Sequence, residues 1–271
     1  MNIKSLKIIG MIHLPPLVGF EGYPGLEAIV EKAIFDLKIL EEGGIHAVII
    51  ENNYDIPHTK YLDTEIIVQM TYLCNILRQK TSLPLGICCL WNDWKSALSI
   101  AKTVGMQFVR IPVFVDHIET HYGYEISENP ETILAYRKKL GAEDIKILTD
   151  IQVKHSTILN SDTIESSSIK AIQQGSDGLI ITGKWTGDMP NLEELERVRK
   201  KVGDFPIITG SGTTDKNITQ ILSIADGTIV GTFLKTNTKE GHTINLRSFE
   251  ENIDIEKVRL LTSLFVSGNQ E

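Results

Sequence analysis

Short apolar runs recur along the chain, and each is followed by a stretch whose apolar residues repeat with helical spacing. Most runs are continuously apolar, as in IIGMI, LGICCL and GLIIT, which is typical of parallel strands buried on both faces. An antiparallel sandwich would instead alternate apolar and polar residues. The predicted strands span 7–13, 47–53, 84–90, 108–114, 145–153, 178–183, 206–212 and 227–234.

The segments between the predicted strands have the features of helices. Some begin after a capping residue, such as Asn129 before Pro130, and several stop at a glycine, such as Gly105. The predicted helices span 26–42, 65–79, 94–104, 130–140, 163–174, 192–202, 217–223 and 255–266. Eight strand–helix pairs in strict alternation predict an α/β protein, a single (β/α)8 TIM barrel over residues 1–271. An open doubly wound sheet is the alternative.

Composition narrows the classes of partner. The formal net charge of −8 gives no general attraction to phosphate backbones, so we expect no nucleic-acid binding, although a local anion pocket stays open. No apolar run reaches the roughly 18 residues that a membrane span needs, so we expect no membrane insertion and a cytoplasmic location. The three cysteines are interpreted as buried reduced thiols. Packing of barrel helices between copies would give a homo-oligomer, but nothing here sets its size.

The loops that follow the strands build the active site of a TIM barrel, so polar residues at strand ends are the catalytic candidates. They are Asp150, Lys154, Glu51 and His13. In a regular strand, Asp150 and Lys154 share one face and His155 lies on the other. A carboxylate beside an ammonium group suits acid–base chemistry, because each changes the pKa of the other.

Several polar residues lie near the same strand ends. The expected substrate-binding residues are Asn52, Asp55, Asn92, Asp93, Arg110, His155 and Lys184. A structural ion-pair network is the alternative for Arg110, since a charge inside an apolar strand must be paired. The histidines and acidic residues show no metal-ligand spacing, so no metal site is predicted, although a divalent metal stays open. His121 is interpreted as a solvated surface residue.

The last quarter of the chain has the strongest local signal, ITGSGTTDKN followed by ADGTIVGTFLK. Glycines after the seventh and eighth strands let backbone N–H groups approach an anion, at the position where such barrels commonly bind phosphate. The predicted phosphate-binding residues are Gly210, Ser211, Gly212, Gly231 and Thr232. Sugar phosphates, nucleotides and flavin mononucleotide (FMN) can all be held this way. The alternative is that these glycines only make tight turns.

These motifs resemble the BtpA/SgcQ family over about residues 10–235. The resembling segments are GMIHLPPLVG, EEGGIHAVIIENNYDIP, ILTDIQVKH, ITGKWTGDMPNLEEL, ITGSGTT and ADGTIVGTFLK. The resemblance implies a ribulose-phosphate-binding type of barrel, and it brings no settled reaction. The family pattern has Arg where Trp91 stands and Asn where Pro112 stands, so we expect the contacts of the third and fourth strands to differ here.

The leading hypothesis is an enzyme that acts on a small phosphorylated substrate, a sugar phosphate or a nucleotide-like compound. Isomerase, lyase and hydrolase chemistry all stay open. Asp150 is expected to be a general acid or base, Lys154 a proton donor or electrostatic stabiliser, and Glu51 an alternative acid or base. Two other classes stay open: a non-catalytic protein of membrane-complex biogenesis, and an FMN oxidoreductase. No cofactor is required by the sequence.

Overall fold

A closed ring of parallel strands forms the centre of the molecule. The computed structural model describes residues 1–183, 185, 187–236 and 248–267. The barrel strands are β1 (Ile8–His13), β2 (Ala47–Glu51), β3 (Leu85–Cys88), β4 (Phe108–Ile111), β7 (Lys146–Ile151), β9 (Gly178–Ile181), β10 (Ile207–Thr209) and β11 (Gly227–Val230). Each pairs in parallel with its neighbours, and β11 closes the ring against β1. The predicted (β/α)8 barrel is therefore confirmed.

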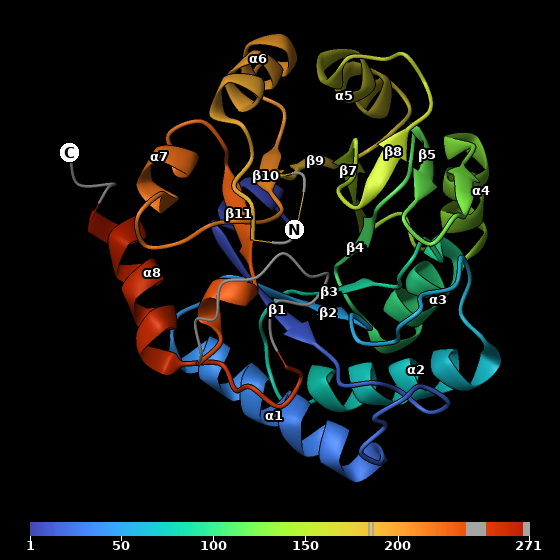
Figure 1. Cartoon of the computed structure of the whole chain (residues 1–271), viewed down its shortest axis with the longest axis vertical. Coiled ribbons are helices and arrows are strands. Elements are labelled where there is room, and N and C mark those ends of the chain that lie inside the picture. Colours follow the sequence, from blue (N-terminus) through green and yellow to red (C-terminus); the bar gives the residue numbers. More distant parts are fainter. Residues whose placement is uncertain (184, 186, 237–247, 268–271) are drawn as a thin grey trace.

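The helices form a layer outside the ring (Figure 1). They are α1 (Leu26–Glu42), α2 (Thr64–Arg78), α3 (Trp94–Val104), α4 (Pro130–Lys139), α5 (Ile164–Gln173), α6 (Leu192–Val202), α7 (Ile218–Leu222) and α8 (Ile255–Ser267). The expected caps are present: Asn129 accepts a hydrogen bond from the amide of Glu131, and Gly105 ends α3 in the left-handed conformation. Local capping signals thus set several helix ends within a residue of the prediction.

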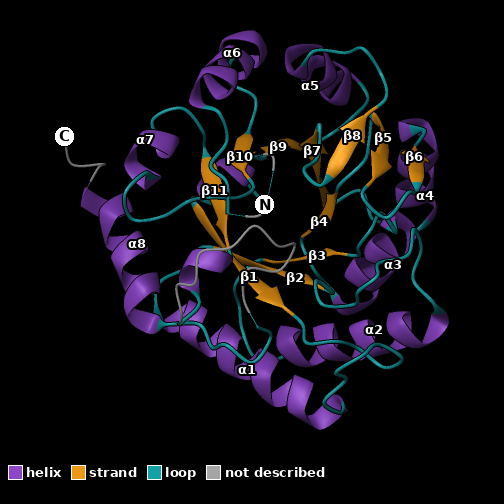
Figure 2. Cartoon of the chain, in the orientation of Figure 1, coloured by secondary structure: helices purple, strands orange, loops and turns teal. Residues whose placement is uncertain are grey.

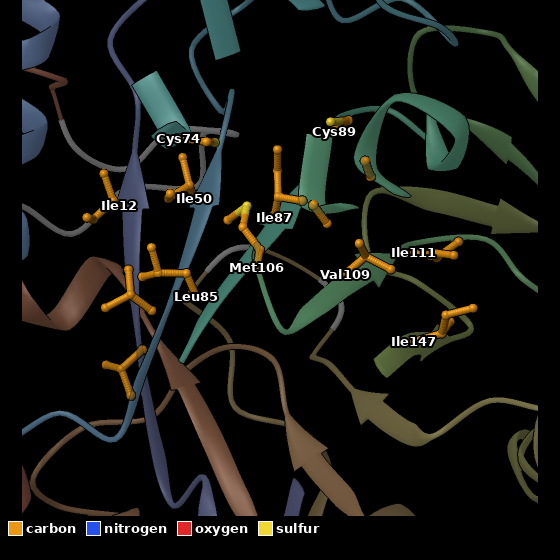
Figure 3. Packing of buried hydrophobic residues seen from close by; sticks show 14 of the residues in the cluster. Ile12, Ile50, Cys74, Leu85, Ile87, Cys89, Met106, Val109, Ile111 and Ile147 are labelled. Atoms are coloured by element: carbon orange, nitrogen blue, oxygen red, sulfur yellow. The ribbon is translucent and has the colours of Figure 1, made fainter. Parts of the chain in front are cut away.

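Alternate side chains of each strand serve two separate cores, which explains the continuously apolar runs. Ile12, Ile50 and Ile87 project toward the helix layer, where they join a cluster that includes Cys74 of α2 (Figure 3). Ile9, Ile49 and Phe108 fill the barrel interior instead. Gly86 leaves room for Phe108, since a Cβ at this position would lie 2.2 Å from the ring.

The amino-terminal segment closes one end of the barrel. A short 3-10 turn, η1 (Ile3–Ser5), places Ile3 and Leu6 in the interior cluster. Figure 1 shows the N-terminus near the centre of the ring. This plug lies at the amino ends of the strands, so the interior is left for a site at their carboxyl ends.

A small antiparallel sheet outside the barrel was not predicted. It has the order β6–β5–β8 and consists of β5 (His117–Thr120), β6 (Glu125–Ser127) and β8 (Ser156–Ile158) (Figure 2). Strand β7 ends at Ile151, because the backbone turns at Gln152 (φ 49°) and again at His155 (φ 58°) to reach β8. The prediction of a regular strand over 145–153 was therefore wrong at its end.

Candidate active site

Charged side chains from β2, β4 and β7 meet the ring of His13 on β1 inside the carboxyl end of the barrel. Arg110 donates to both carboxylate oxygens of Asp150, from Nε and Nη2, at 2.8 Å each. Its Nη1 lies 3.5 Å from Glu51 Oε2, and the other oxygen of Glu51 lies 3.7 Å from His13 Nε2. The four groups thus form one continuous array across the mouth, which we call the charged array.

Arg110 and Asp150 form its most buried part. Asp150 is 0% exposed and Arg110 is 7% exposed. Burial alone would lower the pKa of Arg110, but the charge and hydrogen bonds of Asp150 raise it above its ordinary value. Arg110 therefore stays a cation. Because both oxygens of Asp150 accept from it, Asp150 is placed to fix the guanidinium.

Lys154 lies at the edge of the charged array and differs from its members in its lowered pKa. Burial, followed by the nearby Arg110 cation, lowers the pKa of Lys154 to about 8, while Glu51 and Asp150 act in the opposite direction. Among the described residues, no hydrogen-bond or ion-pair partner of Lys154 is found. An ammonium group with a pKa near neutrality and no fixed partner can give up or take a proton.

His13 is held in its neutral form. Burial lowers the pKa of His13 well below its ordinary value, and the charges of Lys235, Lys154 and Arg110 lower it further. Its ring packs against the backbone of Gly231, where an added Cβ would lie 2.8 Å from Cε1. His13 thus connects the charged array to the strand that closes the barrel.

The opposite half of the mouth, on β9, β10 and β11, carries small residues at the corresponding interior positions. Gly210 lies beside Thr182, since a Cβ on Gly210 would come within 2.6 Å of Thr182 Cγ2. The buried hydroxyl oxygen of Thr182 has no hydrogen-bond partner within the described part of the chain. This half is therefore closely packed around its glycines, and it holds a buried hydroxyl group that has no partner among the described residues.

One side of the predicted phosphate loop is covered by the chain itself. A Cβ on Gly212, which has φ 69°, would lie 2.2 Å from backbone atoms of Asp188 and Met189. Ser211 Oγ donates to the Asp188 carbonyl at 2.9 Å and accepts from the Gly183 amide at 3.1 Å. The backbone that approaches Gly212 closely is therefore that of the loop between β9 and α6. Gly231 and Thr232 lie at the first turn after β11.

Four of the expected substrate contacts join loops to one another. Asn52 bonds to both backbone groups of Leu90, and Asn92 does the same with Val113. Asp93 caps α3 through the amide of Ser96. Asp55 accepts from Leu17 and from Asn52, and burial raises the pKa of Asp55 to about 6. These residues brace the rim of the barrel.

Three further residues singled out in the sequence are Lys184, Trp91 and Pro112. Lys184 lies outside the described residues. Trp91, at a position where the family resemblance implies Arg, is 5% exposed and packs with Ile118 and Val153 beneath the antiparallel sheet. Pro112 is also buried. Both residues that are expected to depart from the family pattern therefore lie in packed positions.

Sequence reasoning missed a group of aromatic rings on the rim. His155 lies 5.3 Å from Trp185 and 5.9 Å from His121, measured between ring centroids, and His121 lies 3.8 Å from Tyr122. The alternating pattern HIETHYGYEIS could have indicated the hairpin that carries His121 and Tyr122. Nothing in the sequence indicates which rings this hairpin meets.

The described residues contain neither a metal-ligand cluster nor a membrane-spanning helix. No group of three or more histidine, cysteine, aspartate or glutamate side chains there could hold a metal ion. No described helix is long and apolar enough to cross a bilayer.

The fold and the polar mouth define the class: a TIM-barrel protein with its candidate site at the carboxyl ends of the strands. The sequence matches the BtpA family over residues 4–266, and the chain belongs to this family. The photosystem I biogenesis protein BtpA of Synechocystis sp. is 36% identical over 231 residues, which cover 84% of this chain and 80% of that protein. An uncharacterised protein of Pyrococcus furiosus is 37% identical over 248 residues, covering 91% and 93% of the two chains.

Solved structures resemble the chain in fold. Phosphoribosyl anthranilate isomerase from Thermus thermophilus superposes with a TM-score of 0.58, covering 96% of this chain and 98% of its own, at 10% sequence identity. Identity this low shows a shared fold and leaves the reaction to be argued from the site.

Proposed function

We propose that this chain is an enzyme that uses acid–base chemistry on a small phosphorylated substrate, a sugar phosphate or a nucleotide-like compound. The observation that carries the proposal is Lys154, a partly buried ammonium group with a pKa of about 8 beside Glu51 and Arg110. Because no hydrogen-bond or ion-pair partner of Lys154 occurs in the described part of the chain, a structural role for this lysine is not evident there. Its pKa suits proton transfer near neutral pH.

The charged array divides the roles. Lys154 transfers the proton, and Glu51 is the second acid or base; it is 5% exposed, and its ion pairs with Arg110 and His13 are 3.5 and 3.7 Å long. Asp150 is a positioning residue in this proposal, because Arg110 occupies both of its oxygens. The neutral ring of His13 can donate a hydrogen bond to a substrate oxygen.

The small-residue half of the mouth receives the phosphate in this proposal. Gly231 and Thr232 offer backbone amides at the turn after β11, and the unsatisfied hydroxyl of Thr182 is a further donor. Ser211 and Gly212 shape the neighbouring loop through their contacts with Asp188. The phosphoribosyl group in the name of the Thermus thermophilus isomerase supports a substrate of this class.

A paired ligand screen tests binding. The thermal unfolding midpoint is measured with sugar phosphates and nucleotides, each beside its dephosphorylated form, and FMN is included. A ligand at 100 times its Kd stabilises the protein by about 2.7 kcal/mol. We expect stabilisation by at least one phosphorylated compound and none by its dephosphorylated partner. Uniform silence would contradict the proposal and favour the non-catalytic alternative.

A solvent-exchange experiment tests the chemistry. Compounds that bind are incubated with the protein in D2O, and deuterium incorporation at carbon is followed by mass spectrometry. We expect Lys154→Met to lose exchange by at least about 100-fold, the lower range for a general acid or base, while it still binds the ligand. Equal exchange by the variant and the natural protein would remove Lys154 from the mechanism.

A further inference from the structure

Five rings from separate loops lie in a row along one side of the barrel mouth. The row runs from the loop after β2 to the β5–β6 hairpin, then to the turn after β7 and the loop after β9. We call it the aromatic row; its members are His58, Tyr122, His121, His155 and Trp185. Successive ring centroids are 3.8 to 5.9 Å apart. The row therefore forms a continuous aromatic surface, although its members are far apart in the sequence.

The aromatic row adjoins the proposed reacting groups. His155 directly follows Lys154, whose charge contributes to the lowered pKa of His155. His58 Nε2 lies 3.2 Å from the carbonyl oxygen of Asn52, the residue after Glu51. Trp185 lies on the same loop as Thr182. A ligand held between Lys154 and Thr182 would therefore lie next to the row.

Two members of the row face solvent and the others hold them in place. Trp185 is 53% exposed, whereas Trp91 and Trp94 are each 5% exposed. His121 is also exposed, and both exposed rings contact His155. His58 is buried at the other end of the row. An indole ring that is exposed at the barrel mouth and supported on one side offers a face for stacking.

The row is uncharged near neutral pH at two positions. Burial lowers the pKa of His58 to about 4, and burial followed by the Lys154 charge lowers the pKa of His155 to about 4. Neutral imidazole and indole rings stack well on flat heteroaromatic rings.

We propose that the aromatic row stacks a planar heteroaromatic ring, so that the substrate is a nucleotide-like compound whose base lies on Trp185 and His121. The inference rests on the proposed function, which supplies the phosphate and the reacting groups. It narrows the substrate from phosphorylated compounds in general to those that carry a flat ring. The row then determines specificity.

Tryptophan fluorescence tests this directly, because Trp185 is exposed while Trp91 and Trp94 are buried. The natural protein is titrated with adenosine 5′-monophosphate, uridine 5′-monophosphate and ribose 5-phosphate, and each affinity is also measured by calorimetry. We expect at least one nucleotide to bind more tightly than ribose 5-phosphate, by about 5-fold to 100-fold, and to quench the emission saturably.

Two variants identify the ring that reports. Trp185→Leu should lose the quenching and weaken nucleotide binding by about 5-fold to 100-fold, with ribose 5-phosphate affinity within about 2-fold of the natural protein. Tyr72→Leu, which removes a ring that is 51% exposed on α2, is the matched control and should change neither.

The outcomes separate the two proposals. If ribose 5-phosphate binds and no nucleotide binds more tightly, the aromatic row has no role in recognition and the proposed function stands. Unchanged nucleotide affinity in Trp185→Leu would overturn the inference in the same way. If no phosphorylated compound binds, both proposals fail together.

Discussion

The two halves of the barrel mouth differ in the size and charge of the residues that line them. On β2, β4 and β7, large charged side chains point inward and pair with one another, most closely in the double hydrogen bond between Arg110 and Asp150. At the ends of β9, β10 and β11, the corresponding residues are Thr182, Gly210 and Gly231, which are small and closely packed, and the Thr182 hydroxyl has no partner among the described residues. Charge alone therefore does not mark the ligand site. The paired charges of Arg110, Asp150 and Glu51 stabilise the barrel mouth, which we call its structural frame. Groups that have no partner among the described residues, such as Lys154 and the Thr182 hydroxyl, are the ones we expect to contact a ligand.

The largest effect should come from breaking the charged half. Arg110→Met leaves Asp150 buried without its cation, and removing one partner of a buried pair costs about 3–5 kcal/mol. Urea denaturation should show this loss in the free energy of unfolding. Arg197→Met removes an exposed arginine that pairs with Glu165, and its unfolding midpoint should stay at the natural value. A stable Arg110→Met protein would contradict the assignment of Arg110 as part of the frame.

The next effect should come from the loop that covers the phosphate segment. Gly212→Ala places a methyl group against backbone that cannot move as a side chain does, so it should cost about 3 kcal/mol. Gly141→Ala is matched to it, because φ is 60° there but nothing lies within 4 Å of the added Cβ. Denaturation of both variants separates backbone strain from the collision. Equal losses would show that the Asp188–Met189 backbone does not press on Gly212.

A smaller effect should appear as pH dependence at the boundary between the halves. The pKa of Lys154 is about 8 in the folded chain against 10.5 for an unperturbed lysine, so the unfolded chain binds more protons between these values. The natural protein should therefore gain stability relative to Lys154→Met as pH rises from 8 to 10.5, by about 2 kcal/mol. Paired denaturation curves across this range measure the difference. If the difference in unfolding free energy between the two proteins does not change with pH, the pKa of Lys154 is that of an unperturbed lysine.

The smallest effect on stability should come from the small-residue half of the mouth, on β9, β10 and β11. Thr182→Val removes a hydroxyl that has no partner in the described structure, so stability should change by less than about 0.5 kcal/mol. Thr209→Val removes a buried hydroxyl that donates to Thr228 and should cost about 1–2 kcal/mol. The affinity for ribose 5-phosphate should fall in Thr182→Val only. A large stability loss there would mean that Thr182 belongs to the frame.

The fold could be predicted because its signals are local. Apolar runs buried on both faces, capping residues such as Asn129 and stop glycines such as Gly105 lie within a few residues of the structure they specify. The helices at 26–42, 94–104 and 192–202 agree with the prediction to the residue. The β6–β5–β8 sheet was missed because its strands are short and the β5–β8 pairing joins segments from two loops, as where Ile118 meets Ile158.

The candidate site could be predicted only as a set of residues. Glu51, Arg110 and Asp150 could be predicted because a charge inside or at the end of an apolar strand must be paired, and the structure brings them together. The partner of each side chain depends on how loops meet: Asn92 bonds across to Val113, and Gln152 turns away because its amide donates to Asp116. Contacts of this kind leave no periodic trace in a sequence.

The proposed chemistry depends most directly on the protonation state of the Lys154 ammonium group near neutral pH. The side chains of isotopically labelled lysine are followed by NMR across the alkaline range, and the Lys154 signal is assigned by its loss in Lys154→Met. We expect a midpoint near 8, which moves when ribose 5-phosphate or a nucleotide that binds is added. A midpoint near 10.5, unchanged by any of these ligands, would contradict it.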